Sequence, residues 1–249
     1  MIPNPILKVL STLTTRRVRF LLMGGQACVL YGATEFSRDT DIVLVPDPAN
    51  VAALKQALED LQAEVIAVPP FDEDYLRRGF AIHFRCAHPD SRGMRVDVMS
   101  VMRGVAAFDE LWCRRLTMEV PGGQVDVLGL PDLICAKKTQ RDKDWPMIRR
   151  LVEAHYNSHH SSPTDDRVRF WLREARTVSI LQAVASQHPA LLAEIVLQRP
   201  LLAGVGGATV ETIEQSLQVE ERLEREADRR YWAPLFKELE QIRHGKKNG

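Results

Sequence analysis

The chain has 249 residues, of which 45% are apolar, and its 33 Lys and Arg residues balance 33 Asp and Glu residues. An apolar share of this size supports a folded core and excludes a disordered chain. The length fits one large or two small domains. The zero formal charge gives no overall signature of a nucleic-acid-binding protein, although it leaves room for a local basic groove.

The cysteines, the N-terminus and the apolar stretches of the chain predict the cellular compartment of the protein. The cysteines lie in apolar periodic stretches without paired spacing: Cys28, Cys86, Cys113 and Cys135. This pattern favours buried free thiols in a reducing compartment over disulfides or a zinc site. The N-terminus lacks a signal-peptide pattern, and no stretch approaches the roughly 20 apolar residues that span a bilayer. We therefore expect a soluble, cytoplasmic protein without a membrane partner.

The first part of the chain predicts helices and strands in alternation. Apolar spacing indicates three helices, over 3–15, 26–31 and 49–62. Apolar runs predict two strands, over 18–23 and 40–45. The second run has no polar alternation, which is typical of a strand buried on both faces. Asp47 or Asn50 is expected to cap the helix that follows it.

The middle of the chain continues this mixture. Strand candidates are 64–68, 80–86, 94–99, 117–120 and 125–128. Helix candidates are 71–78, 107–114, 130–139 and 144–156. The last two helices are either continuous or kinked around Asp142, because Pro146 suits the first turn of a new helix.

Beyond the polar stretch 157–163 the strand pattern stops and helical spacing runs to about residue 243. We therefore expect an α+β domain over 1–157 and an all-helical domain over 158–249. The Glu/Arg-rich helix 209–243 is either a solvated face held by i,i+4 pairs or a helix that binds a protein partner.

Two aspartates, Asp39 and Asp41, open the predicted strand 40–45. Side chains two apart on a strand point to the same side, and two like charges so close repel unless something offsets them. A divalent cation such as Mg²⁺ suits hard carboxylate oxygens. The simpler alternative is that both aspartates are turn or cap residues at the start of a strand.

Further residues point to the same chemistry. Asp97 lies between two valines on a predicted core strand, where a carboxylate needs a partner. If its strand neighbours the Asp39 strand, three carboxylates meet, and such a set suits two-metal phosphoryl or nucleotidyl transfer. Gly24 and Gly25, at a strand-to-helix turn, let backbone amides approach a phosphate.

The run Met23-Gly24-Gly25 up to Asp39-Thr40-Asp41, followed by Val96-Asp97-Val98, resembles the DNA polymerase beta-like nucleotidyltransferase superfamily. There a Gly-Gly or Gly-Ser pair precedes Asp-x-Asp or Asp-x-Glu, and a third Asp lies on a later strand. The resemblance covers about residues 18–100. It implies a nucleotidyltransferase-type mixed β-sheet flanked by helices, with Asp39, Asp41 and Asp97 as catalytic residues and metal ligands.

Within the superfamily the chain looks like small bacterial nucleotidyltransferases of the abortive-infection toxin type. Leu133-Ile134-Cys135-Ala136-Lys137 and Arg141-Asp142-Lys143-Asp144 occupy the places of motifs in that branch. The resemblance implies that Lys137 binds nucleotide phosphates, that Asp144 orients it or a neighbour, and that Arg141 adds a phosphate contact. On one helix these three would share a face, and the alternative is an ordinary solvated face.

The turn before Asp39 departs from the family at one place. Many relatives carry an arginine where this chain has Glu35, and Arg38 is a nearby substitute for that charge. Ser37 matches the family's small hydroxyl residue and is expected to bind a phosphate or cap the turn. We assign both Ser37 and Arg38 to nucleotide binding.

Several histidines and tryptophans have simpler interpretations. His155 and His159 are four residues apart, but a hydrophilic helix end explains them better than a metal site. His83 either lies near Asp97 or is an ordinary strand histidine. Core or interface anchors explain the tryptophans better than base-stacking platforms.

We therefore expect a metal-dependent enzyme that transfers a nucleoside monophosphate from a nucleoside triphosphate to an acceptor hydroxyl. The cofactor would be two Mg²⁺ ions, with Mn²⁺ as a substitute. The acceptor would be RNA such as a tRNA end, a protein side chain or a small molecule such as an antibiotic, chosen by the helical C-terminal region. The alternatives are a non-catalytic nucleotide- or partner-binding module, antitoxin-like, and a phosphohydrolase that uses the same metals.

Overall fold

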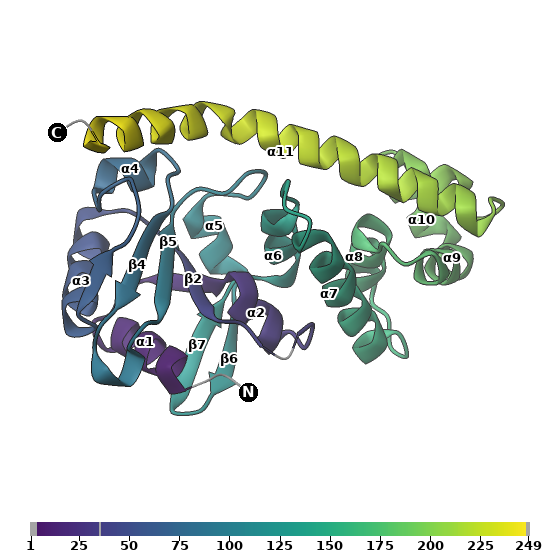
Figure 1. The fold of residues 1–249 in the computed structure, drawn as a ribbon. Helices are drawn as coiled ribbons and strands as arrows, with labels where there is room; N and C mark the ends of the chain where they lie inside the picture. Colours follow the sequence, from purple (N-terminus) through teal and green to yellow (C-terminus); the bar gives the residue numbers. More distant parts are fainter. Residues whose placement is uncertain (1–3, 35, 248–249) are drawn as a thin grey trace. The chain divides into compact units, whose positions relative to one another are not determined.

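The computed structural model describes residues 4–34 and 36–247 and forms two compact units (Figure 1). The sheet unit comprises the described residues within 1–30, 34–136 and 231–249, and the helical unit comprises 31–33 and 137–230. The boundary expected at 157/158 does not coincide with this division, because the helix after residue 144 belongs to the helical unit and the end of the chain returns to the sheet unit.

The described residues of the sheet unit build a seven-stranded mixed sheet in the order β3-β4-β5-β2-β1-β7-β6. The strands are β1 (Phe20–Met23), β2 (Asp39–Leu44), β3 (Ala63–Val65), β4 (Ile82–Cys86), β5 (Arg95–Met99), β6 (Leu116–Val120) and β7 (Gly123–Val127). The pairs β2–β5 and β1–β7 are parallel, whereas the other neighbours are antiparallel.

Helices flank this sheet (Figure 1). They are α1 (Asn4–Thr15), α2 (Gly24–Leu30), α3 (Pro48–Asp60), α4 (Glu73–Arg77), the 3-10 turn η1 (Pro89–Ser91), α5 (Phe108–Cys113) and α6 (Leu130–Lys137). The predicted fold class, a mixed sheet flanked by helices with a helical C-terminal region, is confirmed.

The core of the sheet unit follows from the apolar runs. Ile42, Val43 and Leu44 on β2 are fully buried, which confirms a strand covered on both faces. Asp47 caps α3 by accepting a hydrogen bond from the backbone N–H of Asn50 at 2.9 Å. Asn50 is not the cap but a buried residue in the first turn of α3.

The helical unit begins with α7 (Asp144–His159) and continues with α8 (Asp165–Glu174), α9 (Val178–Gln187), α10 (Pro189–Ile195), η2 (Pro200–Gly204) and the first part of α11 (Val210–Lys247). Trp145 and Trp171 are buried in this unit, as expected of core anchors. Arg176 and Arg199 both bind Glu220 on α11, at 2.9 and 2.8 Å. These charge-assisted bonds join the end of α8 and the start of η2 to α11.

The expectation that Lys137, Arg141 and Asp144 share one helix face is wrong. Helix α6 ends at Lys137 and α7 begins at Asp144, so Arg141 lies in the loop between them. Two hydrogen bonds of Thr139 stabilise the loop between α6 and α7. Its carbonyl accepts from Trp145 Nε1 at 2.8 Å, and its hydroxyl donates to Asp144 at 2.7 Å.

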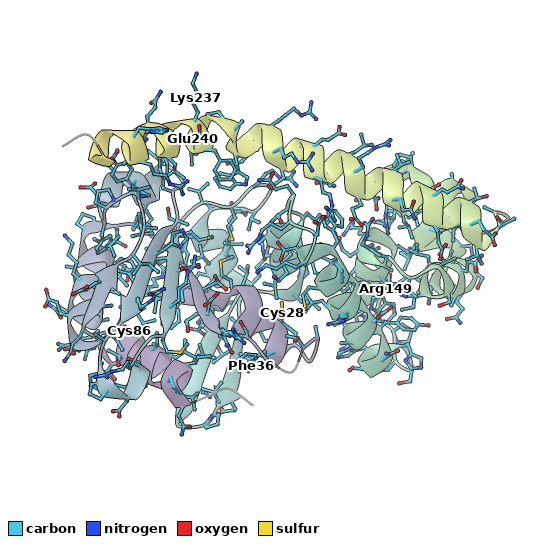
Figure 2. All side chains as sticks on the ribbon, in the orientation of Figure 1. Cys28, Phe36, Cys86, Arg149, Lys237 and Glu240 are labelled. Atoms are coloured by element: carbon cyan, nitrogen blue, oxygen red, sulfur yellow. The ribbon has the colours of Figure 1, made fainter. Side chains whose placement is uncertain are left out.

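The four cysteines form no disulfide bond in the described chain, as predicted. Cys28 on α2 and Cys86 on β4 are buried in the sheet unit (Figure 2). The prediction of buried thiols is wrong for Cys113, which is exposed at the end of α5, and Cys135 on α6 is only half-buried. No helix among the described residues is both long and apolar enough to cross a membrane.

Candidate functional site

The parallel pairing of β2 with β5 brings the three predicted aspartates together. Asp41 lies directly opposite Asp97, and Asp39 lies opposite Arg95. Paired residues on neighbouring strands share a face of the sheet, and so do residues two apart on one strand. Asp39, Asp41 and Asp97 therefore form one carboxylate cluster, because the two strands are neighbours, which the sequence left as a condition.

Asp97 is the most enclosed member of this cluster. Its side chain is 12% exposed, and its Oδ1 accepts a hydrogen bond from Arg95 Nε at 2.7 Å. The same oxygen lies 2.8 Å from Nδ1 of His83, which is opposite Asp97 on β4. Arg95 Nη2 also lies 3.1 Å from His83 Nδ1. Asp97 thus has the partners that a buried carboxylate needs.

These contacts shift the pKa values of Asp97 and Arg95. Burial raises the pKa of Asp97, but its hydrogen bonds with His83 and Arg95 and the charge of the Arg95 guanidinium outweigh this effect, so the pKa lies below its ordinary value. The hydrogen bond to Asp97 raises the pKa of Arg95 against the effect of burial, and the charges of Asp97, Asp39 and Asp41 act in the same direction. Arg95 is therefore the positive charge that all three carboxylates face.

The Gly24-Gly25 turn lies against the cluster. Gly24 adopts φ +63°, and a Cβ at this position would overlap the Asp41 carboxylate. The backbone N–H of Gly25 donates to Asp41 Oδ2 at 3.3 Å. Helix α2 starts at these glycines, two residues before the predicted start at Gln26. Glycine is required here because backbone and carboxylate approach so closely.

The turn before β2 contains two predicted nucleotide-binding residues. A Cβ at Gly25 would collide with the Ser37 side chain, so Ser37 lies directly against the glycine turn. Arg38 is exposed next to Asp39, and Phe36 in the same turn is 58% exposed (Figure 2). Glu35, which stands at the place where the sequence departs from the superfamily pattern that it resembles, lies outside the described residues.

The predicted residues beyond 136 form a group of their own at the start of the helical unit. Lys137 Nζ lies 3.4 Å from Asp144 Oδ1, and both side chains are nearly enclosed, at 13% and 8% exposure. Arg141 is exposed. The role of Asp144 in orienting Lys137, and phosphate binding by Lys137 or Arg141, stay predictions.

The donor chemistry of the cluster fits a hard divalent cation, because three carboxylates share one face of two neighbouring strands. Within residues 4–34 and 36–247, however, no group of three or more His, Cys, Asp or Glu side chains is already arranged to hold a metal ion. One oxygen of Asp97 faces Arg95 and His83 instead. The chemistry and position of these residues thus suit a divalent cation, and a cation on Oδ1 of Asp97 would take the place of a present partner.

Sequence reasoning missed Arg95 and left His83 undecided. The alternation of β5 puts Arg95 on the face of Asp97, and this signal is visible in the sequence. The contact with His83 depends on the register of the β4–β5 hairpin, in which His83 pairs with Asp97. Only the paired strands show that both residues bind the same carboxylate oxygen.

No protein-family model and no curated protein matches this chain. Among solved structures, the chain is similar to an antigenic nucleotidyltransferase-like protein from Paracoccidioides brasiliensis. The two are 17% identical, with 81% of this chain and 89% of that chain covered, and the TM-score is 0.40. A likeness of this size assigns no role to any residue of this chain.

Proposed function

We propose that this chain is a metal-dependent nucleotidyltransferase, which moves a nucleoside monophosphate from a nucleoside triphosphate to an acceptor hydroxyl. The observation that carries the proposal is the pairing of Asp41 with Asp97 on neighbouring parallel strands, beside a glycine turn that contacts Asp41. Three carboxylates close to a turn without side chains leave room for cations and phosphates together.

Asp39, Asp41 and Asp97 would hold two Mg²⁺ ions, which Mn²⁺ can replace. When bound, the ions supply charge that favours ionisation of the acceptor hydroxyl and offsets the negative charge of the phosphates. The acceptor oxygen forms a bond to the α-phosphorus, and the bond from that phosphorus to the β-phosphate oxygen breaks, releasing pyrophosphate. Asp97 would take the proton of the acceptor hydroxyl, while His83 orients this carboxylate through Oδ1.

Other residues of the chain would bind the nucleotide. Gly24 and Gly25 allow the triphosphate to approach the backbone, and Ser37 and Arg38 lie in the turn beside them. In this proposal Lys137, oriented by Asp144, and Arg141 add phosphate contacts. The helical unit would select the acceptor, which is RNA, a protein hydroxyl or a small molecule, or it would bind a partner protein, as in toxin–antitoxin systems.

The direct test incubates the protein with each α-labelled nucleoside triphosphate, Mg²⁺, total RNA and cell lysate, and asks which molecule becomes labelled. Asp41→Asn should lower labelling at least about 100-fold, since it removes a carboxylate of the cluster. Asp90→Asn, in the exposed turn η1, is the matched control and should leave labelling unchanged. Equal labelling by wild type and Asp41→Asn would contradict the proposal.

One observation favours a second candidate, a non-catalytic nucleotide- or partner-binding module on the same fold. Arg95 already offsets the charge of Asp97, so the cluster is not dependent on a metal for its charge balance. Calorimetry with each nucleoside triphosphate, with and without Mg²⁺, separates the candidates. Nucleotide binding that is indifferent to Mg²⁺, without labelling of any acceptor, would favour the module. Release of free phosphate without a labelled acceptor would indicate a phosphohydrolase.

A further inference from the structure

Arg95 lies where its charge meets all three carboxylates of the cluster. It pairs with Asp39 across β2 and β5 and precedes Asp97 by two residues on the same face. Its Nε donates to Asp97 Oδ1 at 2.7 Å. The side chain thus lies on the same face of β2 and β5 as the three carboxylates.

We propose that Arg95 is an internal counter-ion of the carboxylate cluster, which competes with a divalent cation for Asp97. A guanidinium and a metal ion are both positive, and both take carboxylate oxygens as their partners. They cannot hold the same position on one oxygen, so a cation that binds Asp97 through Oδ1 must displace Arg95 from it. This inference rests on the proposed function, because it takes the cluster as the metal site.

The surroundings of Arg95 permit this exchange. Its side chain is 40% exposed, whereas that of Asp97 is 12% exposed, so the guanidinium can swing into solvent while the carboxylate stays in place. His83 remains within 2.8 Å of Asp97 Oδ1 and keeps the carboxylate oriented. Asp97 is therefore a fixed ligand and Arg95 a displaceable one.

A neighbouring arginine explains why Arg95 points toward the carboxylates. Arg85 lies directly opposite Arg95 in the β4–β5 hairpin and is exposed. Like charges at directly opposed positions repel each other. The attraction of the three aspartates and the repulsion of Arg85 thus favour the same position of the Arg95 guanidinium. Arg85 also provides a control at the paired position with the same charge.

The experiment measures Mn²⁺ binding to the full chain, from the electron paramagnetic resonance signal of the free ion, without nucleotide. Arg95→Gln should tighten Mn²⁺ binding about ten- to a hundred-fold, because a charge-assisted hydrogen bond no longer has to break. Arg85→Gln, which removes the same charge from the paired position, should change binding less than about three-fold. Arg95→Lys keeps the charge and should stay closer to wild type than Arg95→Gln. Circular dichroism of each variant checks that it is folded.

The outcomes separate this inference from the proposed function. If wild type binds Mn²⁺ and Asp41→Asn abolishes binding, but Arg95→Gln leaves the affinity unchanged, the counter-ion role is wrong and the metal site stands. If Arg95→Gln and Arg85→Gln increase the affinity for Mn²⁺ equally, the effect comes from the change in net charge, and the counter-ion role is wrong. Absence of Mn²⁺ binding in both wild type and Arg95→Gln would contradict the inference and the metal site together.

Discussion

At the scale of single residues, Gly24 has the closest backbone approach to the carboxylate cluster. Gly24→Ala should destabilise the chain by about 1–2 kcal/mol through its positive φ and by about 1–3 kcal/mol more through overlap with Asp41. Urea unfolding measures both terms against Gly93→Ala, whose φ is +79° but whose surroundings are open. Equal losses in the two variants would show that Asp41 is not in contact with the turn.

The overlap with Asp41 should also make the Gly24→Ala variant bind metal more weakly. A Cβ at position 24 would approach the Cβ and Cγ of Asp41 as well as its Oδ2, so rotation of the carboxylate alone cannot relieve the overlap. We therefore expect weaker Mn²⁺ binding by Gly24→Ala than by Gly93→Ala. This loss distinguishes a glycine that shapes the site from one that only forms a turn.

His155 in the helical unit predicts a pH dependence of stability. Burial, with smaller contributions from His159 and Arg167, lowers the pKa of His155 from 6.5 to about 4. Its Nδ1 accepts a hydrogen bond from Trp171 Nε1 at 2.9 Å, which suits the neutral ring. Between pH 6.5 and 4 the unfolded chain therefore binds the proton more readily than the folded chain, and stability falls as pH falls.

The variant His155→Gln should remove this part of the acid sensitivity. Between pH 7 and pH 4 the wild type should lose more free energy of unfolding than the variant does. After allowance for solvent screening, the extra loss should be on the order of 1 kcal/mol. Thermal unfolding at several pH values measures it, with the exposed His160→Gln as the control. A difference that does not change with pH would show that His155 titrates normally.

At the scale of elements, Asn50 fastens helix α3 to the sheet. It is 7% exposed, accepts a hydrogen bond from the Arg19 backbone N–H at 2.7 Å, and donates to the carbonyls of Arg19 and Val45 at 2.9 Å each. These bonds join the residue before β1 to the residue after β2, and so help to align the strand that bears Asp39 and Asp41.

Removal of these bonds predicts a clear loss of stability. Asn50→Ala should cost about 2–4 kcal/mol, because three backbone groups lose their partner. Gln56→Ala, exposed on the same helix, should change stability by less than about 0.5 kcal/mol. Urea unfolding of both variants provides the comparison, and a loss below 1 kcal/mol for Asn50→Ala would indicate that water replaces the side chain.

At the scale of the whole molecule, helix α11 belongs to both units. Val210 to Arg230 lie in the helical unit, and the residues from Tyr231 onward lie in the sheet unit, where Glu238 forms an ion pair with Arg78. Pro234 lies inside the helix and cannot donate to the carbonyl of Arg230. The helix thus lacks one backbone bond where the chain passes from one unit to the other.

This position predicts a local weakness in α11. Pro234→Ala should restore the missing bond and slow hydrogen exchange of the amides around residues 230–235 by about ten-fold or more, since a proline inside a helix costs about 3 kcal/mol. Exchange measured by mass spectrometry compares it with Lys237→Ala, an exposed change in the same helix. Unchanged exchange in Pro234→Ala would show that the proline leaves the helix intact.

Local patterns in the sequence determined much of this protein. Apolar periodicity predicted most helices and strands, including the fully buried β2, because both depend on neighbours within a few residues. The Gly-Gly turn, Asp39-Thr40-Asp41 and Asp97 were recognisable for the same reason. The break between α6 and α7 was not decided, since it depends on the Thr139 bonds rather than on spacing.

Tertiary structure alone decided which charges meet. The pairing of Asp41 with Asp97 was only conditional in the sequence, because strand order and register arise from contacts far apart along the chain. Tertiary structure also decided that His83 and Arg95 both contact Asp97 Oδ1, and that the last part of α11 belongs to the sheet unit. The carboxylates could therefore be identified from their residue types, but the cation that faces them only from the paired strands.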